Sequence, residues 1–590
     1  MAPVDQGVES PALEDKDLRS IQEVRRLVAR AYDAAKLFEK LPQARIDEIV
    51  DRMAAAALVE SSRLGALAVE ETGYGNPEDK RLKNEFVAHN VARYIRPLRT
   101  MGVISEDPLR RVTEIAVPMG VVAAIIPSTN PTSTAIFKCL ISMKAGNGVV
   151  LSPHPAAARS ILESARVCHD AAVEAGAPEG IIGCMTAPTL EGTTELMKHR
   201  RVAVILATGG AGLVKAAYSS GKPAYGVGPG NVPAYIDRSA HVAKAVRDVV
   251  TGKTFDHGTL CSSEQSLIVD RPVEAEVLRQ LERLRAYVLS EQEKRQLEAV
   301  AILPNRTLNT QVVGKSAQWI ADKAGITVPS GTRVLVVRLD GVGREHPLSC
   351  EKLSPILAFY VADGWRAGCE RCKEVLAFGG MGHTLALHAN DPDVVRQFGL
   401  EKPAFRICVN TPATHGSIGL STALPPSMTL GCGTYGNNIT TDNITPLHLI
   451  QVKRVAWETT EVFPSWLPVD SEAGRRGAAA SRASVPDIVD SYLAARAMGR
   501  GPAAPPAAPP PAAATSVERT ESAPSVTAPP LPPPRPEARP APPPKAVDFV
   551  CEADVRKAIQ AQMKIYVHPR TIITPAARDL ADGHSIFAAV

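Results

Sequence analysis

One cysteine stands in a segment whose composition suits a nucleophile. Cys261 lies in KTFDHGTLCSSEQS, residues 253–266, where small glycine, serine and threonine neighbours leave the backbone open to a reacting carbon. A helical pattern precedes this loop, and the apolar strand Leu267 to Val269 follows it. A thiolate in such a loop can attack a carbonyl carbon and form a covalent intermediate. The same residues also fit a partly buried loop thiol with no catalytic role, so the choice between the two interpretations depends on the rest of the chain.

Three short apolar runs predict the sheet that would position this loop. Val121 to Ile126, Val149 to Leu151 and Val202 to Leu206 are each followed by a turn and then by a helical pattern. Strand, turn and helix repeated three times predict parallel βαβ units in a doubly wound sheet. Ligands bind at the carboxyl ends of such strands. The loops at those ends comprise residues 127–131, 152–155 and 207–212.

Composition excludes several classes of partner. The chain has 590 residues, and 66 Lys and Arg against 62 Asp and Glu give a net charge of +4, which is too balanced to indicate nucleic acid or a membrane surface. No apolar run approaches the roughly 18 residues that span a bilayer. The N-terminus resembles neither a secretion signal nor a transit peptide. We therefore expect a cytoplasmic protein.

The ten cysteines show no framework spacing, which fits reduced thiols. Cys369 and Cys372 form a C-x-x-C pair within the helical pattern Trp365 to Leu376, so both lie on one face. A zinc site would need two further ligands, and the sequence contains no second C-x-x-C. We expect these two thiols to pack in the core, and we predict no metal site.

Seven motifs, taken in chain order, resemble those of the aldehyde dehydrogenase superfamily. Within it, they are most similar to the CoA-acylating branch and to the aldehyde half of bifunctional aldehyde/alcohol dehydrogenases. The resemblance covers roughly residues 17–465 and implies an α/β fold with a doubly wound dinucleotide-binding domain, an α/β catalytic domain and a β oligomerisation arm. The matching stretches are ETGYGNPEDKRLKN (71–84), PSTNPTSTAIFKCLISMKAGNGVVLSPHP (127–155), LATGGAGLVKAAYSSGKPAYGVGPGN (206–231), the Cys261 segment, EKLSPILA (351–358), GGMGHT (379–384) and NTPATHGSIG (410–419).

The resemblance implies thioester chemistry at Cys261. Its thiolate would add to an aldehyde carbon and give a thiohemiacetal oxyanion. The Asn130 amide and the backbone N–H of Cys261 would form the oxyanion hole, where one donor is worth about 3–4 kcal/mol of barrier. Hydride transfer to a nicotinamide would then leave a thioester.

The next step separates the branches of the superfamily. Hydrolytic members place a water-activating glutamate at the position matched here by Val227, and valine cannot activate water. The resemblance therefore implies that coenzyme A takes the acyl group, with hydrolysis to a free acid as the alternative. Glu264 is a candidate replacement base, and His383 and His257 are candidate acid/base groups, although a structural hydrogen bond is the other interpretation of each. Acetaldehyde, propionaldehyde and functionalised aldehydes all remain open as substrates.

The cofactor site is expected at the strand ends. Thr208, Gly209 and Gly210 follow a buried strand and open a helix, so their bare N–H groups can face a pyrophosphate. The loop at 152–155 contains no arginine for a 2′-phosphate, which favours NAD, although Arg159 nearby leaves NADP open. The resemblance adds further cofactor residues: Ile126, Pro127, Ser128, Thr129, Ser152, His154, Gly228 and Glu351.

The remaining expectations concern domains and partners. Residues 500–546 are mostly Pro and Ala, which predicts a disordered linker. Short amphipathic helices are predicted at 484–498 and, within the C-terminal segment 548–590, at 552–566. They resemble the peptides that target enzymes into bacterial microcompartments, so a shell protein is a candidate partner and a passive tail the alternative. Residues 430–453 resemble an oligomerisation arm and imply a homodimer or homotetramer. The expected divisions are 1–16 disordered, 17–239 cofactor-binding, 240–427 catalytic and 428–470 arm.

Overall fold

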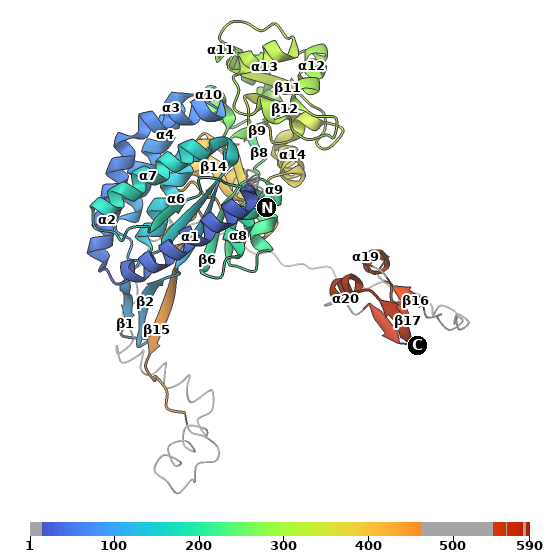
Figure 1. Ribbon diagram of the computed structural model, residues 1–590. Coiled ribbons are helices and arrows are strands. Elements are labelled where there is room, and N and C mark those ends of the chain that lie inside the picture. The colour runs from blue at the N-terminus through green and yellow to red at the C-terminus, as the bar shows by residue number, and fades with distance from the viewer. Residues whose placement is uncertain (1–14, 463–546, 551, 562, 582–585, 590) are drawn as a thin grey trace, which may run out of the picture. The chain divides into compact units, whose positions relative to one another are not determined.

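The computed structural model describes residues 15–462, 547–550, 552–561, 563–581 and 586–589 (Figure 1). The chain divides into two compact units at Gly477 and Ala478, and each is described by itself. Most of the expected disordered N-terminus (residues 1–14), the helix at 484–498 and the linker at 500–546 lie outside the described residues. In the described part of the chain, no helix is long and apolar enough to cross a membrane.

The first unit contains the predicted doubly wound sheet. Its five parallel strands run in the order β5-β4-β3-β6-β7, and all six residues of β3 are buried because helices cover both faces. The three strands predicted from the sequence are confirmed as β3, β4 and β6. The bounds are β3 Val121–Ile126, β4 Gly148–Pro153, β5 Ile182–Cys184, β6 Val202–Thr208 and β7 Ala224–Val227.

A helical layer precedes and flanks this sheet (Figure 1). Asn76 and Pro77 mark the start of α4, where the Asn76 side chain caps the helix by accepting from the Asp79 N–H at 2.9 Å. The helices are α1 Lys16–Phe38, α2 Gln43–Val59, α3 Ser61–Thr72, α4 Pro77–Glu85, a π-helical turn Phe86–Val91, α5 Ala92–Ile95, α6 Pro131–Lys144, α7 Ala158–Glu174, α8 Leu190–Lys198 and α9 Ala211–Tyr218.

A second, seven-stranded parallel sheet carries the cysteine loop. Its order is β10-β11-β12-β9-β8-β13-β14. The chain passes from the first sheet to the second between Val227 and Val232, a few residues before the expected boundary at 239. Its strands are β8 Val232–Ile236, β9 Glu264–Asp270, β10 Ala286–Val288, β11 Val334–Arg338, β12 Ile356–Ala362, β13 Gly382–His388 and β14 Ala404–Val409; its helices are α10 Val242–Thr254, α11 Glu274–Arg283, α12 Glu291–Ala301, α13 Ala317–Ala324, α14 Gly364–Phe378, α15 Pro392–Glu401 and α16 Ala413–Ser417.

Three antiparallel strands form a separate small sheet. β1 Gly102–Asp107 pairs with β2 Val112–Pro118, which pairs in turn with β15 Ile450–Ala456 (Figure 1). The expected arm at 428–470, described as far as residue 462, thus returns to the first part of the chain. Its role in oligomerisation stays a prediction.

The C-terminal unit corrects one expectation. The helix predicted at 552–566 ends at Ala561, and Tyr566 lies in a strand, where it pairs with Ala588. Ile565 and Val567, two residues apart, both pack against the core of this unit, and a period of two is the period of a strand. The strands β16 Val547–Val550, β17 Ile565–Ile573 and β18 Phe587–Ala589 form a parallel sheet, joined by α19 Glu552–Ala561 and α20 Pro575–Ala581 around a small core of Val550, Val555, Ala577 and Ala581.

The C-x-x-C pair lies on α14 with both thiols buried, as expected for core residues. Cys369, Glu370 and Glu401 bring one ligand atom each within 4.8 Å of one another, but both glutamates are exposed. The Lys402 ammonium contacts the Cys369 sulfur, and a cation at that position opposes metal binding.

Candidate active site

A cavity of about 580 Å³ lies at the carboxyl ends of the first sheet, facing the cysteine loop. It collects every predicted nucleophile, oxyanion and cofactor residue, although these come from six separate stretches of sequence. Those lining residues are Cys261, Asn130, Ile126, Pro127, Ser128, Thr129, Ser152, His154, Thr208, Gly209, Gly210, Gly228 and Glu351.

The cysteine loop is shaped by an unusual backbone turn. After α10, Asp256 and His257 both adopt left-handed conformations, with φ of 47° and 52°, and Cys261 follows just before β9. Burial and, to a smaller extent, the nearby Glu351 raise the pKa of Cys261 to about 12, although Arg406 opposes the rise. The thiol therefore needs help to ionise. Arg406, which sequence reasoning missed, is a buried cation that donates to the Gly431 carbonyl at 2.5 Å.

Gly230 lets two segments meet beneath Cys261. A Cβ at Gly230 would lie 2.3 Å from the Cys261 carbonyl oxygen and 3.0 Å from the His383 ring. The Gly230 N–H donates to Glu351 Oε1 at 2.8 Å. Burial also raises the pKa of Glu351, to about 7. The glycine-rich stretch after β7 therefore fixes both the cysteine backbone and the carboxylate in the cavity.

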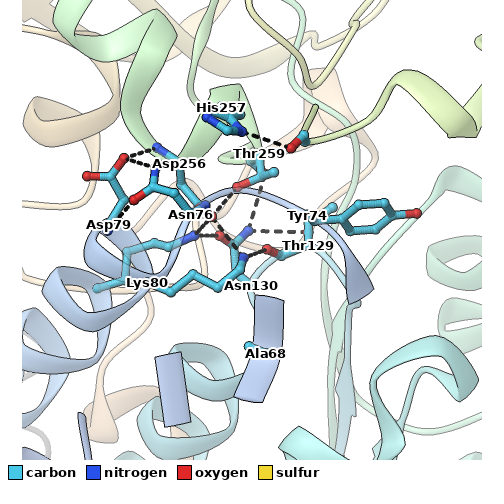
Figure 2. Close-up of polar contacts among 12 residues, drawn as sticks. Ala68, Tyr74, Asn76, Asp79, Lys80, Thr129, Asn130, Asp256, His257 and Thr259 are labelled. Atoms are coloured by element: carbon cyan, nitrogen blue, oxygen red, sulfur yellow. Dashed lines mark hydrogen bonds and ion pairs between the residues drawn. The ribbon is translucent and has the colours of Figure 1, made fainter. Parts of the chain in front are cut away.

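Asn130 stands at the N-cap of α6 but its side chain does not cap the helix. Its Oδ1 instead accepts from Lys83 Nζ at 2.6 Å. Its Nδ2 lies 3.3 Å from the carbonyl oxygen of Thr259, two residues before Cys261, and 3.3 Å from Thr129 Oγ1 (Figure 2). Asn is among the best N-cap residues, so an Asn at the N-cap whose side chain does not cap the helix is available for a different role. Both neighbours of Nδ2 line the cavity.

The glycines of the cofactor loops leave their backbone bare. Gly210 is the N-cap of α9, directly after Thr208 and Gly209 at the end of β6. A Cβ at Gly210 or at Gly228 would meet no protein atom within 4 Å. Exposed N–H groups at a helix start favour an anion, so these loops can hold the pyrophosphate of a dinucleotide.

Glu264 and His383 do not line the cavity. Glu264 is buried at the start of β9, its Oε1 accepts from the Ala413 N–H at 2.6 Å, and burial raises its pKa to about 8. His383 packs behind Gly230 with Nδ1 3.0 Å from Thr384 Oγ1, and burial lowers its pKa to about 3. His257 Nδ1 contacts the carbonyl oxygen of Gly314 at 3.1 Å. This geometry favours the structural interpretation of all three.

The apolar part of the cavity was missed by sequence reasoning. Leu353, Ile418, Met428 and Leu430 line it together with the catalytic residues. They come from three loops that no local pattern links, so only the folded chain reveals them. Leu353 also has a left-handed φ of 46°. These side chains are suited to contact the substituent of a small aldehyde.

Comparison with known proteins gives a consistent result. The family model "Aldehyde dehydrogenase family" matches residues 14–309. The chain is 44% identical over 446 residues to aldehyde-alcohol dehydrogenase 2 of Entamoeba histolytica, covering 74% of this chain and 51% of that protein. It is 35% identical over 444 residues to succinate-semialdehyde dehydrogenase (acetylating) of Clostridium kluyveri, covering 75% of this chain and 98% of that protein. The chain spans about half the length of the aldehyde-alcohol dehydrogenases it matches.

Solved structures agree. An acetylating aldehyde dehydrogenase from Geobacillus thermoglucosidasius superimposes with a TM-score of 0.76 at 53% identity, covering 77% of this chain and all of that one. Two propionaldehyde dehydrogenases superimpose with TM-scores of 0.67 at 27% identity, and each match covers 74% of this chain and 97% of the other. One is from the Clostridium phytofermentans fucose utilisation bacterial microcompartment. The other is from Rhodopseudomonas palustris, with bound CoA and an acylated cysteine. The resemblance carried by the motifs is therefore confirmed, and the chain belongs to the aldehyde dehydrogenase family.

Proposed function

We propose that this chain oxidises a small aldehyde with NAD and transfers the acyl group from Cys261 to coenzyme A. The observation that carries the proposal is Val227, which lines the cavity at the end of β7 where hydrolytic relatives are expected to hold a glutamate. Among the lining residues, all within the described part of the chain, Glu351 is the one carboxylate, and its Oε1 already accepts from Gly230. Apart from Glu351, a thioester in this cavity would thus meet no carboxylate of the lining that could activate water.

The geometry supports the following sequence of steps. Sγ of Cys261, once deprotonated, attacks the aldehyde carbon, and the carbonyl oxygen becomes an oxyanion. The Cys261 N–H and Asn130 Nδ2 donate to that oxygen. The residues at the strand ends would hold NAD, which would supply the acceptor for the hydride lost as the C=O bond re-forms. The acyl group stays on Cys261 until the thiol of coenzyme A attacks; the bond between Cys261 Sγ and the acyl carbon then breaks, and the Cys261 sulfur takes up the proton that the coenzyme A thiol loses.

The relatives support the acylating branch. The Clostridium kluyveri protein is named as acetylating, and the Rhodopseudomonas palustris structure combines bound CoA with an acylated cysteine. The same chemistry at Cys261 accounts for the combination of nucleophile, oxyanion donors and valine found here.

The preference for NAD rests on Arg159. This arginine, near the 152–155 loop, is the residue that left NADP open, but its guanidinium donates to Glu70 Oε1 at 2.6 Å. Glu71 accepts from the backbone N–H groups of Arg159 and Ser160 at the start of α7. Two carboxylates at this helix end disfavour an added phosphate. We expect a lower KM for NAD than for NADP, and the reverse ratio would overturn this part.

We further propose a homo-oligomer joined through the β1-β2-β15 sheet, and a bacterial microcompartment as the location. Support comes from the arm resemblance and from the relative that belongs to a microcompartment. Deleting residues 478–590 should leave kcat unchanged and abolish co-purification with shell particles. Unchanged co-purification would refute the targeting role.

The decisive experiment follows NADH release over a panel of aldehydes with and without coenzyme A. We expect sustained NADH release that requires coenzyme A, formation of the acyl-CoA, and no turnover in Cys261→Ala. Equal NADH release without coenzyme A, accompanied by free acid, would replace the acylating assignment with hydrolysis.

A further inference from the structure

Two buried lysines share one buried aspartate behind Asn130. Lys80 and Lys83, both on α4, have side chains only 1% and 2% exposed, and the Asp256 side chain is 0% exposed. Asp256 Oδ2 accepts from Lys80 Nζ at 2.9 Å and also from Lys83 Nζ (Figure 2 shows the Lys80 contact). Burying charges is costly unless they are paired, so a cluster of this kind is not expected without a reason.

The cluster joins three segments of the active site. Lys80 Nζ donates to the Thr129 carbonyl at 3.1 Å, in the loop after β3. Thr259, in the loop before the nucleophile, donates through Oγ1 to Asp256 Oδ2 at 2.6 Å. The carbonyl of Thr259 in turn lies 3.3 Å from Asn130 Nδ2. Helix α4, the oxyanion loop and the cysteine loop are therefore tied together through Asp256.

Lys83 decides which end of the Asn130 amide faces the reacting carbon. An amide has an accepting oxygen at one end and a donating NH₂ at the other, whereas an ammonium group can only donate. Contact with Lys83 Nζ at 2.6 Å therefore holds Oδ1 on the lysine side. Nδ2 is left on the side of Thr259, the cavity and the cysteine loop. The reversed amide would set NH₂ against the ammonium and an oxygen against the developing oxyanion, and both contacts would be repulsive.

We propose that Lys83 is a positioning residue for the oxyanion hole: it fixes the Asn130 amide with its N–H groups toward the substrate oxygen, and Asp256, which also accepts from Lys80, fixes Lys83. The proposal rests on the proposed aldehyde oxidation. A charged donor on Oδ1 also polarises the amide and makes Nδ2 a stronger donor. Burial lowers the pKa of Lys83 to about 8, and Asp256 opposes that change, so the aspartate keeps the cation available at neutral pH.

The test compares Lys83→Met, Asn130→Ala and the double variant in the single-turnover NADH burst with saturating NAD and aldehyde. Lys83→Met should lower the burst rate about 10- to 100-fold, because a misdirected donor loses part of the 10²–10³-fold worth of an oxyanion contact. The KM for NAD should change less than about threefold. The double variant should be no slower than Asn130→Ala within about twofold, because both changes remove the same interaction.

Lys144→Met is the matched control. Lys144 is also a wholly buried lysine, paired with Asp47 and with the Arg96 carbonyl at 2.9 Å, and it does not line the cavity. The Lys144→Met variant should lose about as much thermal stability as Lys83→Met, but its burst rate should equal that of the wild type. The proposal is overturned if the Lys83→Met and Asn130→Ala effects multiply, or if Lys83→Met slows the burst no more than Lys144→Met. A wild-type protein without an NADH burst would instead refute the proposed function, before any variant is compared.

Discussion

Gly230→Ala offers a direct test of how tightly the cysteine loop is held. The new Cβ would lie 2.3 Å from the Cys261 carbonyl oxygen, about 1 Å closer than the 3.4 Å at which such contacts become ordinary. It would also lie 3.0 Å from the His383 ring, which is buried and has little room to retreat. The clash is with backbone, so it cannot be relieved by a rotamer change and the nucleophile loop itself has to move.

The size of the effect follows from that displacement. A misplacement of about 1 Å at a reacting group can cost about 10²-fold in rate, which corresponds to about 2.7 kcal/mol of barrier. We therefore expect kcat for CoA-dependent NADH formation to fall about 100-fold in Gly230→Ala. Alkylation of Cys261 by iodoacetamide, followed by mass spectrometry, should slow as well, because the loop carries the thiol with it.

Gly399→Ala is the matched control for this substitution. Gly399 lies within α15, a Cβ there would meet nothing within 4 Å, and alanine is the better helix former. Its activity should equal that of the wild type and its melting temperature should not fall. If folded Gly230→Ala kept kcat within about twofold of the wild type, the close approach of the two segments would not control the position of the nucleophile.

Three further changes probe the charges of the site. Val227→Glu should introduce NADH formation without coenzyme A, with free acid as product, and its absence by product analysis would weaken the reliance on Val227. Arg406→Met should slow iodoacetamide alkylation of Cys261 by up to about tenfold, or one pKa unit, because the cation that lowers the thiol pKa is lost; an unchanged rate would contradict this. Glu264 has its pKa raised from 4.5 to about 8, so the folded state keeps a proton that the unfolded state loses, and stability falls as pH rises between these values. Denaturant unfolding at several pH values should show the free energy of unfolding of Glu264→Gln rising relative to the wild type by on the order of a few kcal/mol across that window. Exposed Glu461→Gln should show no such trend.

Sequence reasoning succeeded where chemistry or period is local. The run Val121 to Ile126 forms β3, as predicted, because a short apolar segment rich in β-branched residues and bounded by turns favours a buried strand. The residues of the cofactor loops fell into one cavity because the carboxyl ends of parallel strands share an edge. Family motifs, and not periodicity, singled out Asn130 and Glu351.

The failures have equally physical causes. Lys83 lies 47 residues from Asn130 and 173 from Asp256, and a lysine on a polar helix is normally interpreted as solvated. Only the packing of α4 against two loops turns it inward. Tyr566 was assigned to a helix because a helical stripe runs into a strand pattern with no glycine or proline between them. Arg406 and the apolar lining were beyond reach because they depend on contacts between distant segments.

The oxyanion hole links the proposed steps to the cluster behind it. Aldehyde addition and the attack of coenzyme A on the thioester both place negative charge on the same oxygen, in front of the same two donors. Loss of the orientation imposed by Lys83 should therefore slow both half-reactions, and pre-formed acyl-enzyme should transfer its acyl group more slowly in Lys83→Met. A glutamate at Val227 acts differently, because it offers water a base and leaves the donors in place. In an enzyme that lacks the base, the nucleophile that can enter the cavity decides the fate of the thioester, and the donors aimed by the buried charges decide how fast that nucleophile reacts.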